Sequence, residues 1–213
     1  MKKVVSLLLA LAMTLSVMTT VFAESKSSIS VSLASEPDTL DPALNSAVDG
    51  ATMIVHLFAG LSTWDKNDEG QFVIVPDLAV ELPEGVLNED DTVTYTYTLK
   101  DGLVWSDGQP LTAKDFEFAW KRAASADLGA DYGYMFEVIK GYGEELAVKA
   151  LDDKTLEVTI NNVIPYWNEL LAFPTYFPVR EDVVANEAWA TDPSTYIGNG
   201  PYTMTGWEHN SVI

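Results

Sequence analysis

The stretch Tyr95–Ala123, YTYTLKDGLVWSDGQPLTAKDFEFAWKRA, carries the signals for a strand, a turn and a helix in succession. From position 93 to 100, apolar and polar residues alternate with a period of two, which predicts a half-buried strand. Asp101-Gly102 favours a tight turn, because glycine accepts positive φ. Thr112 is a favourable N-cap with Asp115 three residues later, so a helix is expected next. The apolar stripe of that helix is Phe116, Ala119, Trp120 and Ala123.

This stretch resembles the signature of the oligopeptide-binding proteins, the solute-binding subunits of peptide-importing ABC transporters. The positions that fit the family motif are Tyr95, Thr96, Leu99, Gly102, Trp105, Asp107, Gly108, Pro110, Leu111, Thr112, Ala113, Asp115, Phe118 and Trp120. Shorter matches lie at 35–42 (SEPDTLDP) and around Gly200-Pro201-Tyr202. So many matching residue types in one run are more specific than a lone glycine motif.

The resemblance implies a mixed α/β (α+β) fold, a periplasmic-binding-protein-like lobe of the cluster C type with a small inserted α/β domain. By analogy, residues 24–60 form the first part of lobe I, residues 61–180 the inserted domain, and residues 181–213 the continuation of lobe I. The likeness covers residues 29–213, but family members are much longer. We therefore expect an amino-terminal fragment, truncated before the second lobe.

The composition narrows the classes of partner. The chain of 213 residues has 32 acidic and 12 basic side chains, giving a formal charge of −20. Such a chain repels nucleic acid, so no nucleic-acid partner is expected. The chain has no cysteine, which excludes disulfides, thiolate zinc sites and a cysteine nucleophile.

The first 23 residues predict a secretory signal peptide. Lys2 and Lys3 precede an apolar run at 4–17, and Val21-Phe22-Ala23 is typical of a cleavage site. The apolar run is short for a membrane-spanning helix. No cysteine follows for lipid attachment. We expect an exported protein, periplasmic or extracellular, on the outer side of the cytoplasmic membrane and not inserted in it after cleavage.

Other patterns predict further elements. Strands are expected at 29–33, 61–64, 72–75, 148–151 and 156–160, and a strand entry at 197–207. Helices are expected at 47–61, 165–171 and 181–190. The loop 65–70 looks like the start of a calcium loop, but Pro76 stands where an EF-hand needs a bidentate glutamate. A polar hairpin turn is the better interpretation.

Nothing in the sequence favours catalysis. His56 lies in an apolar helical pattern and is expected in the core or at an interface, and no G-x-S-x-G motif is present. Asp90-Asp91 and Asp152-Asp153 fall in expected turns, where exposure leaves pKa values ordinary. Gly141-x-Gly143 lacks the third glycine of a nucleotide loop. The chain has two histidines and no cysteine, so we expect no metal site. We also expect that the protein is not an enzyme and has no cofactor.

The resemblance implies that two lobes close on an extended oligopeptide and hold it through main-chain hydrogen bonds. A membrane permease would then receive the ligand, and the full-length protein would be a monomer. The matching ligand-binding positions are Asn45, Ser46, Ala47 and Val48, with Tyr132 or Tyr134 from the inserted domain; Asn199 is a weaker candidate. Core packing is an equal alternative for the tyrosines, and the turn before Gly200 is the expected role of Asn199.

Two other functions remain open. The same signature occurs in nickel and haem importers, so a nickel-, haem- or other small-solute-binding relative is one alternative. A peptide receptor or chaperone without a transport role is the other.

Overall fold

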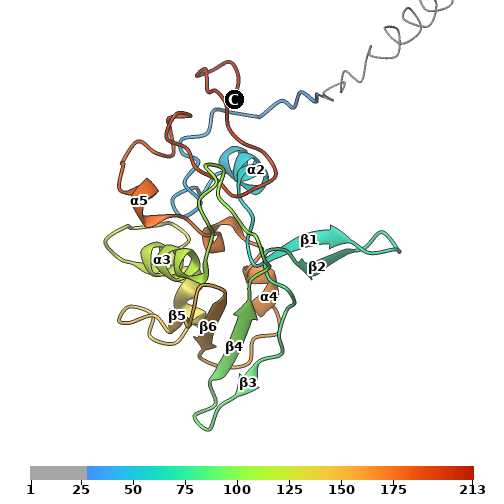
Figure 1. Cartoon of the computed structure of the whole chain (residues 1–213), viewed down its shortest axis with the longest axis vertical. Coiled ribbons are helices and arrows are strands. Elements are labelled where there is room, and N and C mark those ends of the chain that lie inside the picture. The colour runs from blue at the N-terminus through green and yellow to red at the C-terminus, as the bar shows by residue number, and fades with distance from the viewer. Residues whose placement is uncertain (1–27) are drawn as a thin grey trace, which may run out of the picture. The chain divides into compact units, whose positions relative to one another are not determined.

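The structure, a computed structural model, describes residues 28–213, and the signal peptide expected at residues 1–23 lies outside them. The chain divides into two units, Met1–Ser32 and Leu33–Ile213, and all described helices and strands belong to the second. These are α2 (Val48–Leu57), β1 (Ser62–Lys66), β2 (Phe72–Pro76), β3 (Val86–Leu87), β4 (Val93–Thr98), α3 (Ala113–Ala124), η1 (Gly133–Val138), β5 (Val148–Ala150), β6 (Thr155–Ile160), α4 (Trp167–Leu170), η2 (Pro174–Tyr176) and α5 (Glu181–Val184) (Figure 1).

The second unit is built on a four-stranded antiparallel sheet with the order β3-β4-β6-β5 (Figure 1). Its centre is the β4–β6 ladder, in register from Val93↔Ile160 to Thr98↔Thr155. Tyr97 and its partner Leu156 are fully buried, whereas Thr96 and Thr98 are exposed. The strand predicted from the alternation at 93–100 is therefore confirmed.

Helix α3 packs against β5 and β6 (Figure 1). The predicted apolar stripe is buried, with Trp120 fully enclosed. The Trp120 ring meets Tyr176 edge to face at 5.2 Å, and its indole N–H donates to the Tyr176 carbonyl at 2.8 Å. Burial of a large apolar side chain stabilises a fold by about 1.5–3 kcal/mol. Helix α3 thus joins the sheet to η2 through its most buried residues.

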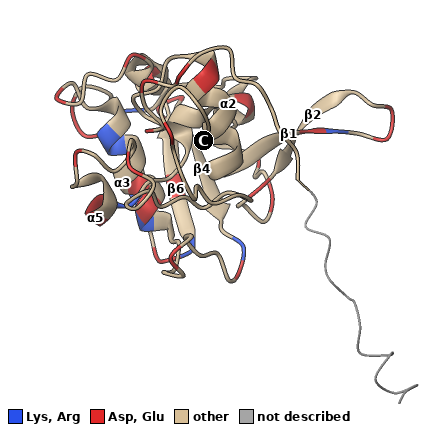
Figure 2. Cartoon of the chain, turned by 90° about the horizontal axis from the view of Figure 1, so that it is seen from above, with Lys and Arg blue, Asp and Glu red and all other residues tan. Residues whose placement is uncertain are grey.

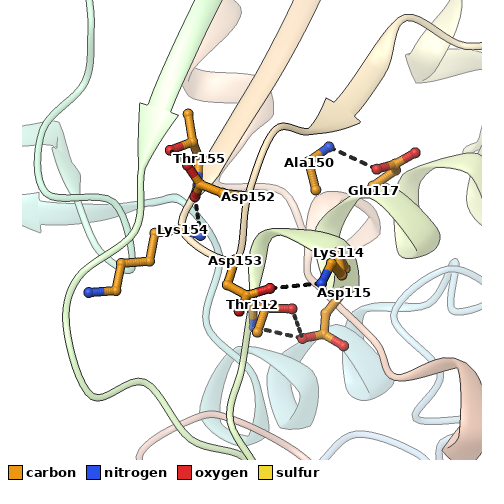
Figure 3. A network of polar contacts seen from close by, with 9 residues as sticks. All are labelled: Thr112, Lys114, Asp115, Glu117, Ala150, Asp152, Asp153, Lys154 and Thr155. Carbon is orange, nitrogen blue, oxygen red and sulfur yellow. Dashed lines mark hydrogen bonds and ion pairs between the residues drawn. The ribbon is translucent and has the colours of Figure 1, made fainter.

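Figure 3 shows how the start of α3 is fixed. The Asp115 carboxylate accepts the Thr112 N–H at 2.7 Å and the Thr112 hydroxyl at 3.2 Å, which confirms the predicted cap. One turn on, the Glu117 carboxylate accepts the N–H of Ala150 in β5 at 2.8 Å. The helix is therefore tied to the edge of the sheet as well as capped.

Strands β1 and β2 form a separate hairpin that projects from the rest of this unit (Figure 1). Their register runs from Ser62↔Pro76 to Lys66↔Phe72. In the connecting loop, the Asn67 side chain accepts the N–H groups of Glu69 and Gln71. These bonds confirm the polar hairpin turn predicted for residues 65–70.

Several expected elements differ from the structure. Residues 29–33 form no strand, and the 197–207 segment enters none. The helix expected at 47–61 ends at Leu57, because the next residues pair with a distant segment: the Leu57 carbonyl accepts the N–H of Gly200 at 2.9 Å.

The helix expected at 181–190 is the single turn α5. The Asn186 side chain accepts the N–H of Ala188 at 3.1 Å. A local side-chain bond of this kind competes with helix continuation, which accounts for the early end.

Candidate functional site

Residues 45–48 lead directly into α2. Asn45 is 7% exposed, and its amide donates to the Ala47 carbonyl at 3.0 Å. Ser46 and Ala47 are exposed, and Val48 keeps 84% of its surface in solvent. The segment therefore combines one buried anchor with three consecutive residues that face solvent.

The backbone of this segment offers hydrogen-bond donors. Within the described part of the chain, no group accepts a hydrogen bond from the N–H of Ser46, Ala47 or Val48. Such orphan N–H groups at a helix start carry partial positive charge and attract carbonyl or carboxylate oxygens. This arrangement can pair with the main chain of an extended ligand.

One carboxylate stands in the first turn of α2. Asp49 accepts the Ser35 hydroxyl and the N–H of Gly50. These hydrogen bonds, that of Ser35 first, hold the pKa of Asp49 below its ordinary value. The negative charge that remains near the helix start favours a neutral carbonyl over a free anion at the exposed N–H groups.

The two candidate tyrosines lie at the start of η1. Tyr134 is 57% exposed, and Tyr132 is half-buried. Their rings are 6.3 Å apart, and Tyr132 meets Phe173 edge to face at 5.1 Å. Phe173 was not predicted as part of this group, because no local pattern connects residues so far apart in the sequence. The cluster presents one packed ring and one open ring.

Asn199 is fully engaged with the backbone. Its side-chain oxygen accepts the Ala59 N–H at 3.1 Å, and its amide donates to the Ala59 carbonyl at 3.0 Å. This two-point clamp holds the chain just after α2. No described hydrogen bond, ion pair or ring contact joins Asn199 or the tyrosines to residues 45–48. The structure thus presents three separate groups of candidates.

The structure corrects two expectations about titratable residues. His56 lies on the exposed face of α2, where its Nδ1 donates to the Thr52 carbonyl at 2.7 Å, so the core alternative is wrong and a place at an interface stays a prediction. The pKa values of the turn carboxylates are not all ordinary. The Lys140 ammonium and the Thr92 hydroxyl, in that order, lower the pKa of Asp90 to about 2, and backbone and hydroxyl donors lower that of Asp152.

Acidic side chains lie on many surface loops of the protein, whereas lysine and arginine are sparse (Figure 2). Residues 28–213 contain no group of three His, Asp or Glu side chains placed to share a metal ion. None of the helices in that range combines the length and apolar character needed to cross a bilayer.

Comparisons with known proteins agree with this fold. Residues 73–213 match the family described as bacterial extracellular solute-binding proteins, family 5 (middle). The chain is 36% identical over 200 residues to the oligopeptide-binding protein OppA of Bacillus subtilis, covering 88% of this chain and 35% of that protein. It is 34% identical over 192 residues to the probable deoxycholate-binding periplasmic protein YgiS of Escherichia coli, covering 84% of this chain and 34% of that protein.

A solved structure, that of Listeria monocytogenes OppA bound to peptide, superposes with a TM-score of 0.72 at 33% identity. The match covers 81% of this chain and 35% of the Listeria chain. The mixed α/β fold is therefore that of the periplasmic peptide-binding proteins, and the chain spans about a third of the length of the relatives it matches. By sequence and by fold, the chain belongs to the bacterial extracellular solute-binding proteins of family 5.

Proposed function

We propose that this protein is an extracytoplasmic solute-binding protein that captures oligopeptides and delivers them to the membrane permease of an ABC importer. The observation that carries the proposal is the family match, together with the peptide-binding relatives at 36% and 33% identity. The capture makes and breaks no covalent bond, so the protein is not an enzyme. It acts as an exported monomer, with no nucleic-acid partner.

The main chain of the ligand is the part recognised. Residues 46–48 present N–H groups without a described partner, which suits β-type pairing with any extended peptide. Tyr132 and Tyr134 supply an aromatic contact, and Asn199 supports the backbone at Ala59, just beyond the opposite end of α2. Pairing through the backbone makes affinity depend weakly on side-chain identity.

The domain division proposed with this function keeps its expected boundaries. Residues 24–60 and 181–213 belong to lobe I, and residues 61–180 form the insert. The ligand is enclosed between lobe I and a second lobe that is characteristic of the longer relatives. Closure of the two lobes would be the signal read by the permease.

Val48→Pro tests main-chain recognition. Val48 is the first residue of α2, and the preceding Ala47 is extended, with φ −109° and ψ 151°. Proline is tolerated at this position and removes the N–H. We expect peptide affinity, measured by titration calorimetry with peptides of varied sequence, to fall by about two- to tenfold, the value of one hydrogen bond.

The matched control is Val48→Ala, which removes the side chain and keeps the N–H; its affinity should stay within about twofold of the unaltered protein. Peptides N-methylated along the backbone should not bind. Equal losses in both variants would contradict main-chain recognition.

A small-solute role is the second candidate, because the relative YgiS is named as a probable deoxycholate-binding protein. Deoxycholate, Ni²⁺ and haem are therefore titrated in parallel with the peptides. Binding of one of these solutes without any peptide signal would replace the proposal.

A further inference from the structure

We propose that Arg122 is the positioning residue for the candidate ligand segment 45–48, acting through Asp41. Arg122 is in the last turn of α3, and Asp41 precedes α2 by several residues. The guanidinium donates to the Asp41 carboxylate through two nitrogens, Nη2 to Oδ2 at 2.6 Å and Nη1 to Oδ1 at 3.1 Å. Two parallel charge-assisted bonds fix the carboxylate in orientation as well as in place.

The pair is enclosed. The side chain of Asp41 is 2% exposed and that of Arg122 is 16% exposed. A carboxylate so removed from water depends on its partner, because removal of one member leaves the other charge buried and uncompensated. The buried Asp41 carboxylate therefore depends on Arg122 for the compensation of its charge.

Asp41 in turn fixes the following turn through hydrogen bonds. Its Oδ1 also accepts the N–H of Ala43 at 2.9 Å. Its carbonyl accepts the N–H groups of Leu44 at 3.2 Å and Asn45 at 2.9 Å. One residue thus fixes three successive peptide units, and the last of them belongs to Asn45, the buried anchor of the candidate segment.

The exposed part of the segment is held at its carbonyl groups. Ser46, Ala47 and Val48 face solvent, and the described side-chain contacts that reach them are the Asn45 amide bond to the Ala47 carbonyl at 3.0 Å and the Thr52 hydroxyl bond to the Val48 carbonyl at 2.7 Å. The bond from Asn45 links the segment to the turn that Asp41 fixes, so the direction of its N–H groups is set by that turn together with the first turn of α2. This inference rests on the proposed function for the use of those groups, and on geometry alone for their placement.

Arg180 offers a matched control. Its side chain is 15% exposed and, like Arg122, makes short ion pairs, here to Asp107 and Asp182 at 2.6 Å. It supports the loop at 107 and not the turn at 41–45. Arg122→Gln and Arg180→Gln therefore remove the same kind of interaction from two different places.

The first measurement is amide hydrogen exchange in the whole 213-residue chain. In Arg122→Gln we expect the amides of Ala43, Leu44 and Asn45 to exchange at least about tenfold faster, while β4 and β6 keep their protection. Arg180→Gln should leave these three amides unchanged. Exchange at 43–45 that is the same in Arg122→Gln as in the unaltered protein overturns the inference.

Arg122→Lys covers the case in which the glutamine variant does not fold. Lysine keeps the charge and loses the two-point geometry, so it should restore folding and only part of the protection at 43–45. Full protection in the lysine variant would show that charge alone suffices, and would overturn the positioning role.

The second measurement is peptide affinity by calorimetry. Arg122→Gln should weaken binding by about tenfold and Arg180→Gln by less than about twofold. Faster exchange at 43–45 with unchanged affinity overturns the link to the ligand. If the unaltered protein binds no peptide, the proposed function fails, and the exchange measurement alone decides whether Arg122 positions the segment.

Discussion

Gly50 shows how little space surrounds the candidate ligand segment. A Cβ at this position would lie 2.0 Å from the Asn45 Oδ1 and 3.0 Å from the Thr39 carbonyl oxygen. Asn45 cannot move away freely, because it is buried and its amide is bonded to the Ala47 carbonyl. The glycine is therefore required by close packing within the first turns of α2.

Gly50→Ala should destabilise the protein. The gain in helix propensity is about 1 kcal/mol, and the overpacking costs about 1–3 kcal/mol. We expect a net loss of about 1 kcal/mol in urea unfolding, and at most about 2 kcal/mol. The control is Gly206→Ala, where no atom lies within 4 Å of the added Cβ, and its change should stay below about 0.5 kcal/mol. A Gly50→Ala protein as stable as the original would contradict this account.

Among elements, α3 was the easiest to predict because its signals are local. Its cap, its apolar stripe and the turns around it lie within one stretch, and the structure confirms them. Helix α2 was predicted too long, because its end is set by bonds from Gly200 and Asn199. The local apolar pattern of a helix does not indicate that a distant segment will bind the backbone groups at its end.

Asp115→Ala tests the cap of α3. The substitution leaves the Thr112 N–H without its acceptor, and loss of such a cap costs about 0.5–2 kcal/mol. We expect that loss in chemical unfolding followed by tryptophan fluorescence.

Asp153→Ala is the control from the same network in Figure 3. The Asp153 side chain pairs with Lys114 at 2.8 Å, but the side chain of Asp153 is 69% exposed and that of Lys114 is 70% exposed. An exposed pair contributes less than about 1 kcal/mol. Equal losses for Asp115→Ala and Asp153→Ala would show that the cap is not the source of the stability.

Across the whole molecule, carboxylates tie segments that are distant in sequence. Lys140 donates to Asp90 at 2.8 Å across 50 positions, and Lys154 donates to Asp101 across 53. These contacts, with the hydroxyl of Thr92 on Asp90, hold the pKa values of both carboxyl groups below the ordinary range. The folded chain therefore favours the ionised forms.

Asp90→Asn should change how stability depends on pH. The pKa of Asp90 is about 2 in the folded protein and about 4 when unfolded. Its stabilising contribution is fully present above the unfolded value and is lost as the pH falls through the folded value. In urea unfolding, the difference between the variant and the original protein should be constant above about pH 5 and shrink toward pH 2.

Glu89→Gln, in the same turn, is the control for a general effect of lost negative charge. Its difference from the original protein should not follow the Asp90→Asn curve. If the stability difference between Asp90→Asn and the original protein grows as the pH falls, the pH dependence has the opposite sign. That result would rule out the proposed contribution of Asp90.

The sequence by itself determined the mixed α/β class, the β4–β6 alternation, the α3 cap and the likeness to the peptide-binding family. These depend on contacts within a few residues, or on a motif carried by one stretch. Tertiary structure decided where α2 ends, that Phe173 packs on Tyr132, and that Arg122 reaches Asp41. The reason is physical: hydrogen bonds and ring contacts between distant segments depend on how the whole chain packs, which local periodicity does not record.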